Sequence, residues 1–166
     1  MKKDIFKILL LTVLGFFVAI IGYPVLHELG HILASMVAGA KVMDLTLLPI
    51  PGVLCDVTGV SNTGLVLIGF GGTVFPLAFS LVIPRRWFVG WYIRVSIQGM
   101  SSLALGISLV SVICGINPQD DMIQVLNFWQ YSKALILVIL AVLLFAIVAV
   151  IAADKPLRRV CKYFEI

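Results

Sequence analysis

Residues 27–31 read HELGH and lie inside an otherwise apolar stretch that runs from Ile5 to Ala38. On a helix, residues four apart lie on one face, so the imidazoles of His27 and His31 point the same way and Glu28 lies beside them. This is the H-E-x-x-H pattern, in which two histidines bind zinc and the carboxylate accepts a proton from a metal-bound water. The alternative is a pair of hydrogen-bonded histidines beside an incidental glutamate. Burying three ionisable groups in lipid without a metal or partner costs several kcal/mol, which favours the metal site.

The composition is typical of an integral membrane protein, because 61% of the residues are hydrophobic and only 12% are charged. The length of 166 residues predicts a single polytopic membrane domain over 1–166. The net charge of +4 does not indicate a nucleic-acid partner, because the basic residues flank hydrophobic segments. Three cysteines at unrelated spacings, Cys55, Cys114 and Cys161, indicate neither a disulfide framework nor a cysteine zinc site.

Four apolar segments are long enough to cross a bilayer, which needs about 20 helical residues. The expected spans are about 5–38, 64–83, 95–116 and 134–153. The first is longer than a membrane requires, and Pro24 is expected to kink it because proline cannot donate to the carbonyl four residues back. The apolar amino-terminal run imitates a signal peptide, but no small-x-small cleavage site follows it. We therefore expect an uncleaved span.

The segment between the first two spans has a different character. Residues 41–47 partly alternate in polarity, 49–52 have turn chemistry, and 53–60 are rich in valine. These features predict a short β-hairpin at or within the membrane surface, with an ordinary interfacial loop as the alternative. The expected fold class is an all-α integral membrane protein with about four transmembrane helices and this hairpin between the first and second.

The positive charges predict the orientation. With four spans and a cytoplasmic amino terminus, ten of the twelve lysines and arginines lie at cytoplasmic ends, and only Lys41 and Lys133 lie opposite. This is a strong positive-inside bias, and it predicts a multi-pass cell-membrane protein with cytoplasmic termini. In the alternative, the chain turns at residues 22–24 and residues 23–39 form a separate return span. That arrangement leaves five basic residues inside against seven outside.

A catalytic zinc commonly has three protein ligands and a water, and the chain has no third histidine. The third ligand must then be a carboxylate or a thiolate. Asp120 and Asp121 follow the third span on the same side as the two histidines, although such residues are often loop charges or a helix N-cap. Asp121 is the leading candidate, because residues 122–126 continue an apolar helical face from it. Asp120 is the reserve, and Asp44 and Asp56 come next.

These motifs resemble the site-2 protease family of intramembrane zinc metalloproteases. The HELGH pattern on a membrane helix, followed by a hairpin-like segment, is similar to that family's first motif. Residues 71–76 (GGTVFP) resemble its glycine- and proline-containing core helix, and Asn117-Pro118 with a following aspartate resembles its third-ligand segment. The resemblance covers roughly residues 15–125. The chain departs from the family in the residues around Asp121, which are not Leu-Asp-Gly, and in a charge pattern that places the zinc away from the cytosol.

The resemblance implies hydrolysis of peptide bonds in transmembrane or membrane-associated protein substrates. Zinc held by His27, His31 and Asp121 would activate a water, with Glu28 as the general base. The hairpin would offer an edge strand to an unwound substrate, and the glycines at 69, 71 and 72 would permit close backbone approach or simple helix packing. The alternative function is a non-proteolytic metal-binding membrane protein that binds or regulates other membrane proteins. A closed site with four protein ligands, including both Asp120 and Asp121, would favour that alternative.

Overall fold

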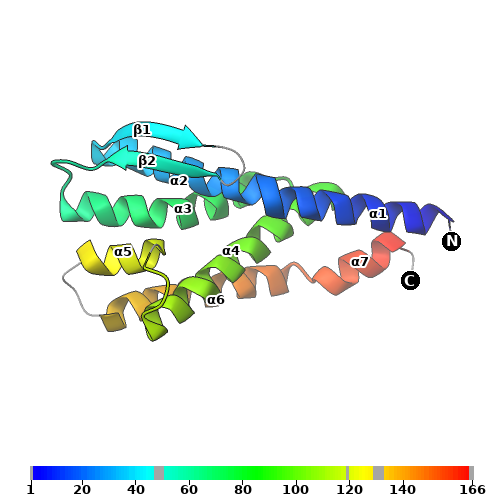
Figure 1. Cartoon of the computed structure of the whole chain (residues 1–166). Coiled ribbons are helices and arrows are strands. Elements are labelled where there is room, and N and C mark those ends of the chain that lie inside the picture. Colours follow the sequence, from blue (N-terminus) through cyan, green and yellow to red (C-terminus); the bar gives the residue numbers. More distant parts are fainter. Residues whose placement is uncertain (1, 47–50, 119, 129–132, 165–166) are drawn as a thin grey trace.

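The computed structural model describes residues 2–46, 51–118, 120–128 and 133–164, and this part of the chain is mostly helical (Figure 1). A two-stranded sheet interrupts the helices after the second of them. In chain order the elements are α1 (Lys2–Phe17), a π-helical turn (Val18–Gly22), α2 (Tyr23–Ala38), β1 (Lys41–Thr46), β2 (Gly52–Asp56), α3 (Asn62–Val82), α4 (Phe88–Cys114), α5 (Asp121–Phe128), α6 (Lys133–Ala153) and α7 (Pro156–Phe164).

Four helical segments in the described part of the chain are long and apolar enough to cross a membrane. The expected spans 5–38, 64–83 and 134–153 agree closely with α1–α2, α3 and α6. Most of the expected third span, 95–116, lies within α4, which is longer at its amino-terminal end and begins at Phe88. Arg94, which the charge pattern assigned to a cytoplasmic end, is buried within α4, and its guanidinium donates to the Leu81 carbonyl at 3.4 Å.

The first apolar segment is one continuous helix from Asp4 to Ala38, so the alternative with a chain reversal at residues 22–24 is wrong. A π-helical turn lies immediately before Pro24, where the sequence predicts a kink. The Tyr23 N–H donates to the Val18 carbonyl, five residues back instead of four. This wider turn lets the helix continue past a proline that cannot donate its own hydrogen bond.

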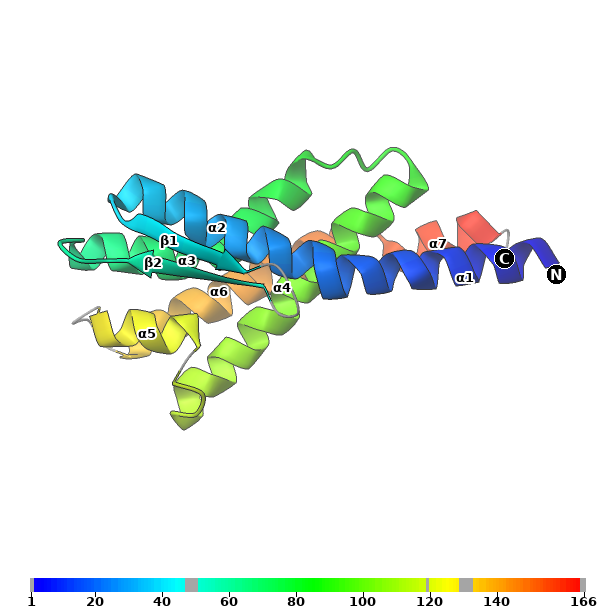
Figure 2. The same cartoon turned by 45° about the horizontal axis from the view of Figure 1, so that its top comes forward.

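The loops between the helices lie toward two opposite ends of the molecule (Figures 1 and 2). The amino terminus, the loop after α3 and the junction of α6 with α7 lie at one end. The hairpin, α5 and the start of α6 lie at the other end. The first end therefore carries the basic residues that the charge pattern assigned to the cytoplasm: Lys2, Lys3, Lys7, Arg85, Arg86, Arg94, Lys155, Arg158, Arg159 and Lys162.

The predicted hairpin is confirmed, and the interfacial-loop alternative is wrong. Strands β1 and β2 pair antiparallel from Lys41↔Asp56 to Thr46↔Gly52, with a shift in register after Val42. Most of the expected turn, residues 47–50, lies outside the described residues. The hairpin lies over α2, and the Cys55 thiol is 3.2 Å from the Ser35 hydroxyl.

Two packing contacts position the elements that matter for function. Helices α2 and α3 meet backbone to backbone, because a Cβ on Gly71 would lie 2.6 Å from the Gly30 carbonyl oxygen and 2.7 Å from the Ala34 Cβ. The short helix α5 is anchored by Met122 and Val125, which are fully buried in a cluster with residues of α4 and α6. Together these contacts hold α2, α3 and α5 around a common space.

Candidate metal centre

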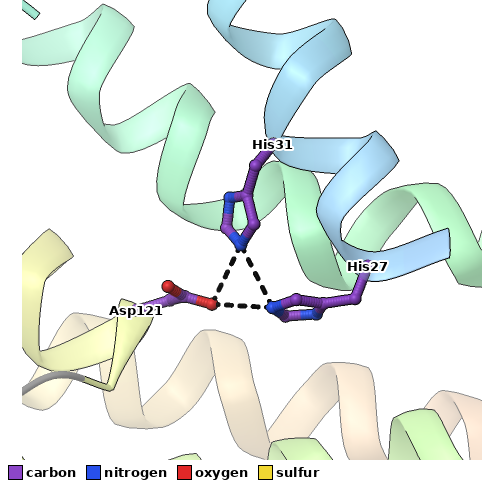
Figure 3. A group of neighbouring side chains, drawn as sticks. All are labelled: His27, His31 and Asp121. Carbon is purple, nitrogen blue, oxygen red and sulfur yellow. Dashed lines mark hydrogen bonds and ion pairs between the residues drawn. The ribbon is translucent and has the colours of Figure 1, made fainter. Parts of the chain in front are cut away.

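Three side chains from two elements converge on one point (Figure 3). His27 and His31 come from adjacent turns of α2, and Asp121 comes from the first turn of α5. The Asp121 Oδ2 lies 3.1 Å from His27 Nε2 and 3.2 Å from His31 Nε2, and the two Nε2 atoms are 3.1 Å apart. This group can hold a metal ion. It contains both histidines of the H-E-x-x-H pattern and the leading candidate for the third ligand.

The donor atoms have the spacing and the chemistry of metal ligands. Neighbouring ligands of a tetrahedral zinc with bonds near 2.05 Å are about 3.3 Å apart, close to the three distances measured here. The His31 Nδ1 is 2.8 Å from the Ile68 carbonyl oxygen and must donate its hydrogen to it. A neutral His31 therefore presents a lone pair at Nε2 toward the Asp121 carboxylate. Such a convergence of electron-rich atoms is repulsive unless a cation or a proton lies between them.

Asp121 is suited to act as an anionic ligand. Burial alone would raise the pKa of its carboxyl, but when the imidazoles are protonated, hydrogen bonds from His27 and His31 and their charges hold the pKa well below its ordinary value. Its place in the first turn of α5 also favours the charged form, because the amino-terminal end of a helix carries partial positive charge. The side chain is therefore ionised over the physiological pH range.

Asp120, the reserve candidate, has a different role. Its Oδ1 accepts a hydrogen bond from the Met122 N–H at 2.9 Å, and its Oδ2 accepts one from the Ser108 hydroxyl at 3.0 Å. Its carbonyl accepts from the Gln124 N–H at 3.0 Å, so Asp120 is the N-cap of α5. The structure thus brings one of the two adjacent aspartates to the histidines and uses the other to begin the helix.

The next two reserve carboxylates lie on the hairpin and bind local backbone. Asp44 Oδ1 accepts from the Leu45 N–H, and Asp56 Oδ1 accepts from the Thr58 N–H, each at 2.9 Å. Neither belongs to the group that can hold a metal.

Two glycines of α3, Gly69 and Gly72, leave space for side chains at this site. A Cβ on Gly72 would lie 2.7 Å from His27 Cε1 and 2.8 Å from His27 Nε2, and it would also clash with His31 Nε2. A Cβ on Gly69 would clash with Val125 of α5. The expectation of close backbone approach is therefore confirmed at Gly71, which meets the Gly30 backbone, whereas Gly69 and Gly72 make room for side chains. The sequence did not indicate that Gly72 faces the imidazoles.

A cavity of about 610 Å³ lies in front of the three side chains. Its lining includes His27, Glu28, His31 and Asp121 on one side and residues 52–55 of β2 on another. Glu28 is half-buried, and it lines the same cavity as the ligand atoms. The cavity joins the H-E-x-x-H motif to the hairpin.

The comparisons with known proteins found no matching family model, curated protein or solved structure for this chain.

Proposed function

We propose that this chain is an intramembrane zinc metalloprotease that hydrolyses peptide bonds of transmembrane or membrane-associated protein substrates. The observation that carries the proposal is the convergence of His27, His31 and Asp121 beside a cavity that Glu28 also lines. The four long apolar helices support placement of this site within a bilayer.

The donor set supports a catalytic zinc. Two imidazole nitrogens and one carboxylate oxygen form a ligand set used by zinc hydrolases, which leave the fourth position for water or substrate. When bound, zinc supplies Lewis acidity that polarises a substrate carbonyl and lowers the pKa of a water. In the described part of the chain, Asp120 caps α5 and does not join this group. This argues against a closed site with four protein ligands and so against the non-proteolytic alternative.

The protein groups around the site have separate tasks. Glu28 would accept the proton of the attacking water and deliver it to the leaving amine. The Ile68 carbonyl holds His31 in the tautomer whose Nε2 is free to bind a metal. Because Gly72 has no side chain, the two imidazoles can lie directly against the backbone of α3.

The substrate would enter as an extended strand. A helical substrate must unwind first, because its carbonyl groups are hydrogen-bonded within the helix. In the two-stranded sheet, β1 pairs with one edge of β2, and β2 also lines the cavity. An extended peptide that adds to the second edge of β2 would pass between that strand and the metal ligands.

We further propose that the four segments cross the cell membrane with both termini in the cytoplasm. The grouping of ten basic residues at one end of the molecule supports this orientation. The hairpin and α5, which carries Asp121, would then lie in the half of the bilayer nearer the opposite face.

The deciding experiment replaces Glu28 by Gln in the full-length chain reconstituted in nanodiscs. Metal analysis and cleavage of a model transmembrane substrate are measured on the same preparation. We expect one zinc per chain in wild type and in Glu28→Gln, with cleavage slower by about 10²–10⁴ in the variant, because the amide keeps the shape but removes the base. His27→Ala should lose both zinc and cleavage.

The matched control is Glu165→Gln, which changes the only other glutamate in the same way. It should cleave like wild type. Near-normal cleavage by Glu28→Gln would reject Glu28 as the base. A wild-type protein that holds zinc but cleaves no substrate would instead favour the non-proteolytic alternative.

A further inference from the structure

A second cavity, of about 520 Å³, lies at the end of the molecule opposite the hairpin, between the start of α4 and α7. Most of the side chains around it are cationic, and the others are aromatic. The lining residues are Arg86, Phe88, Arg158, Arg159, Lys162 and Tyr163. Among the residues that the structure describes, no carboxylate lines this space. The cavity is therefore a concentrated site of positive charge.

The cavity has a rigid frame. The rings of Phe88 and Tyr163 stack at 3.8 Å with an angle of 7° between their planes, which ties α7 to α4. Arg159 donates to the Arg85 carbonyl at 2.8 Å and to the Asp154 carbonyl at 3.2 Å. Asp154 forms its ion pair with Arg85, outside the cavity. The neighbouring carboxylate is thus already engaged, and the charge inside the cavity has no acidic partner within the described part of the chain.

Helix α7 separates its charges from its apolar side chains. Arg158, Arg159 and Lys162 lie on the face that borders the cavity. The other face carries Leu157, whose side chain is 81% exposed, and Val160. A short cationic helix with an exposed apolar face is typical of helices that lie in the plane of a membrane interface.

We propose that this cavity binds the phosphate headgroup of an anionic phospholipid, while the apolar face of α7 enters the acyl boundary of the same leaflet. Arginine and lysine are the side chains that recognise phosphate, and basic pockets beside membrane helices hold anionic headgroups. The cavity lies at the same end as the other basic residues, where the cytoplasmic leaflet is expected. The inference rests on the proposed membrane insertion and is independent of proteolysis.

The test uses the full-length protein in a neutral detergent. Dioctanoyl phosphatidylglycerol and dioctanoyl phosphatidylcholine are titrated separately, and bound lipid is measured by native mass spectrometry and calorimetry. We expect phosphatidylglycerol to bind more tightly and to weaken as salt rises. The double variant Arg158→Gln/Lys162→Gln should weaken phosphatidylglycerol binding about 25-fold, since each cation near such a headgroup contributes about fivefold.

The matched control is Lys41→Gln/Lys133→Gln, which removes the same net charge at the opposite end. Its affinity for phosphatidylglycerol should stay within twofold of wild type. Zinc content and thermal unfolding of both variants show that the fold is retained. The proposal is overturned if Arg158→Gln/Lys162→Gln binds phosphatidylglycerol as wild type does, or if phosphatidylcholine binds equally well. Competition by inorganic phosphate at the same concentration would also overturn it, because the cavity would then take a free anion and not a lipid.

Discussion

His31 is oriented by a backbone atom, the Ile68 carbonyl on the neighbouring helix. The spacing of HELGH predicted that His27 and His31 share one face with Glu28 beside them. The structure brings the two imidazoles together with Asp121, and Glu28 lines the same cavity. Two adjacent aspartates were the main candidates for the third ligand, and the apolar helical face that follows Asp121 favoured Asp121 over Asp120. The hydrogen bond from His31 to the Ile68 carbonyl and the space that Gly72 leaves for the imidazoles were not predictable. A backbone carbonyl is present at every residue, and the type of residue does not show which glycine faces the site.

The first residue-scale prediction separates the two adjacent aspartates. Asp121→Asn removes the ligand charge and should lose zinc on dialysis against a mild chelator. Asp120→Asn keeps an oxygen that can cap α5 and should retain zinc almost as wild type does. Metal analysis after dialysis measures both. If Asp120→Asn loses the metal and Asp121→Asn keeps it, the assignment of the ligand is wrong.

A second residue-scale prediction concerns Gly72. The added methyl group of Gly72→Ala meets both imidazoles and should lower zinc affinity by roughly 10–100-fold, the range seen when groups that orient ligands are lost. Gly99→Ala is the control, because a Cβ on that glycine of α4 meets nothing within 4 Å. Competition with a zinc-sensitive dye gives both affinities. Equal affinities would show that the imidazoles do not need the space at Gly72.

At the scale of elements, the apolar runs and the turn chemistry predicted most helices and the hairpin correctly. Helix α4 begins before the expected third span, at Phe88, and includes the buried Arg94. The docking of α5 was also beyond prediction, since it depends on contacts between segments far apart in the chain. Gly69 of α3 makes room for Val125 of α5, so α5 packs closely against α3.

A double-mutant cycle tests the contact between Gly69 and Val125. Gly69→Ala should push α5 away and weaken zinc binding, because its new methyl group meets the Val125 side chain. Val125→Ala in the same chain removes that obstacle and should restore most of the affinity, so the two changes are not additive. Zinc affinity is measured for both single variants and the double variant. Strict additivity would mean that the spacing of α3 and α5 does not control the site.

At the scale of the whole molecule, the number of long apolar helices and the grouping of basic residues at one end follow from composition and charge. The sequence also left open a five-span arrangement, and the continuous first helix removes it. That continuity depends on a π-helical turn before Pro24, which no pattern of residue types predicts. The two cavities at opposite ends are likewise products of packing.

The orientation of the chain in the membrane is tested by the accessibility of single cysteines in intact cells. Cys114, at the end of α4, is exposed and can be kept alone by Cys55→Ala and Cys161→Ser. We expect a membrane-impermeant maleimide to label it from outside. A chain in which Lys155→Cys provides the only thiol should be labelled only after permeabilisation. The reverse pattern would place the termini outside.

The position of the imidazoles along α3 affects how water, a reactant in hydrolysis, reaches them. Gly72, against which they lie, is ten residues from each end of α3, or about 15 Å in each direction. A hydrocarbon layer about 30 Å thick would therefore have the metal ligands near its middle, where water is scarce. The cavity in front of them, of about 610 Å³, is large enough to hold several water molecules. Hydrolysis at that depth would draw on this internal reservoir, and the size of the cavity would limit how readily water reaches the peptide bond.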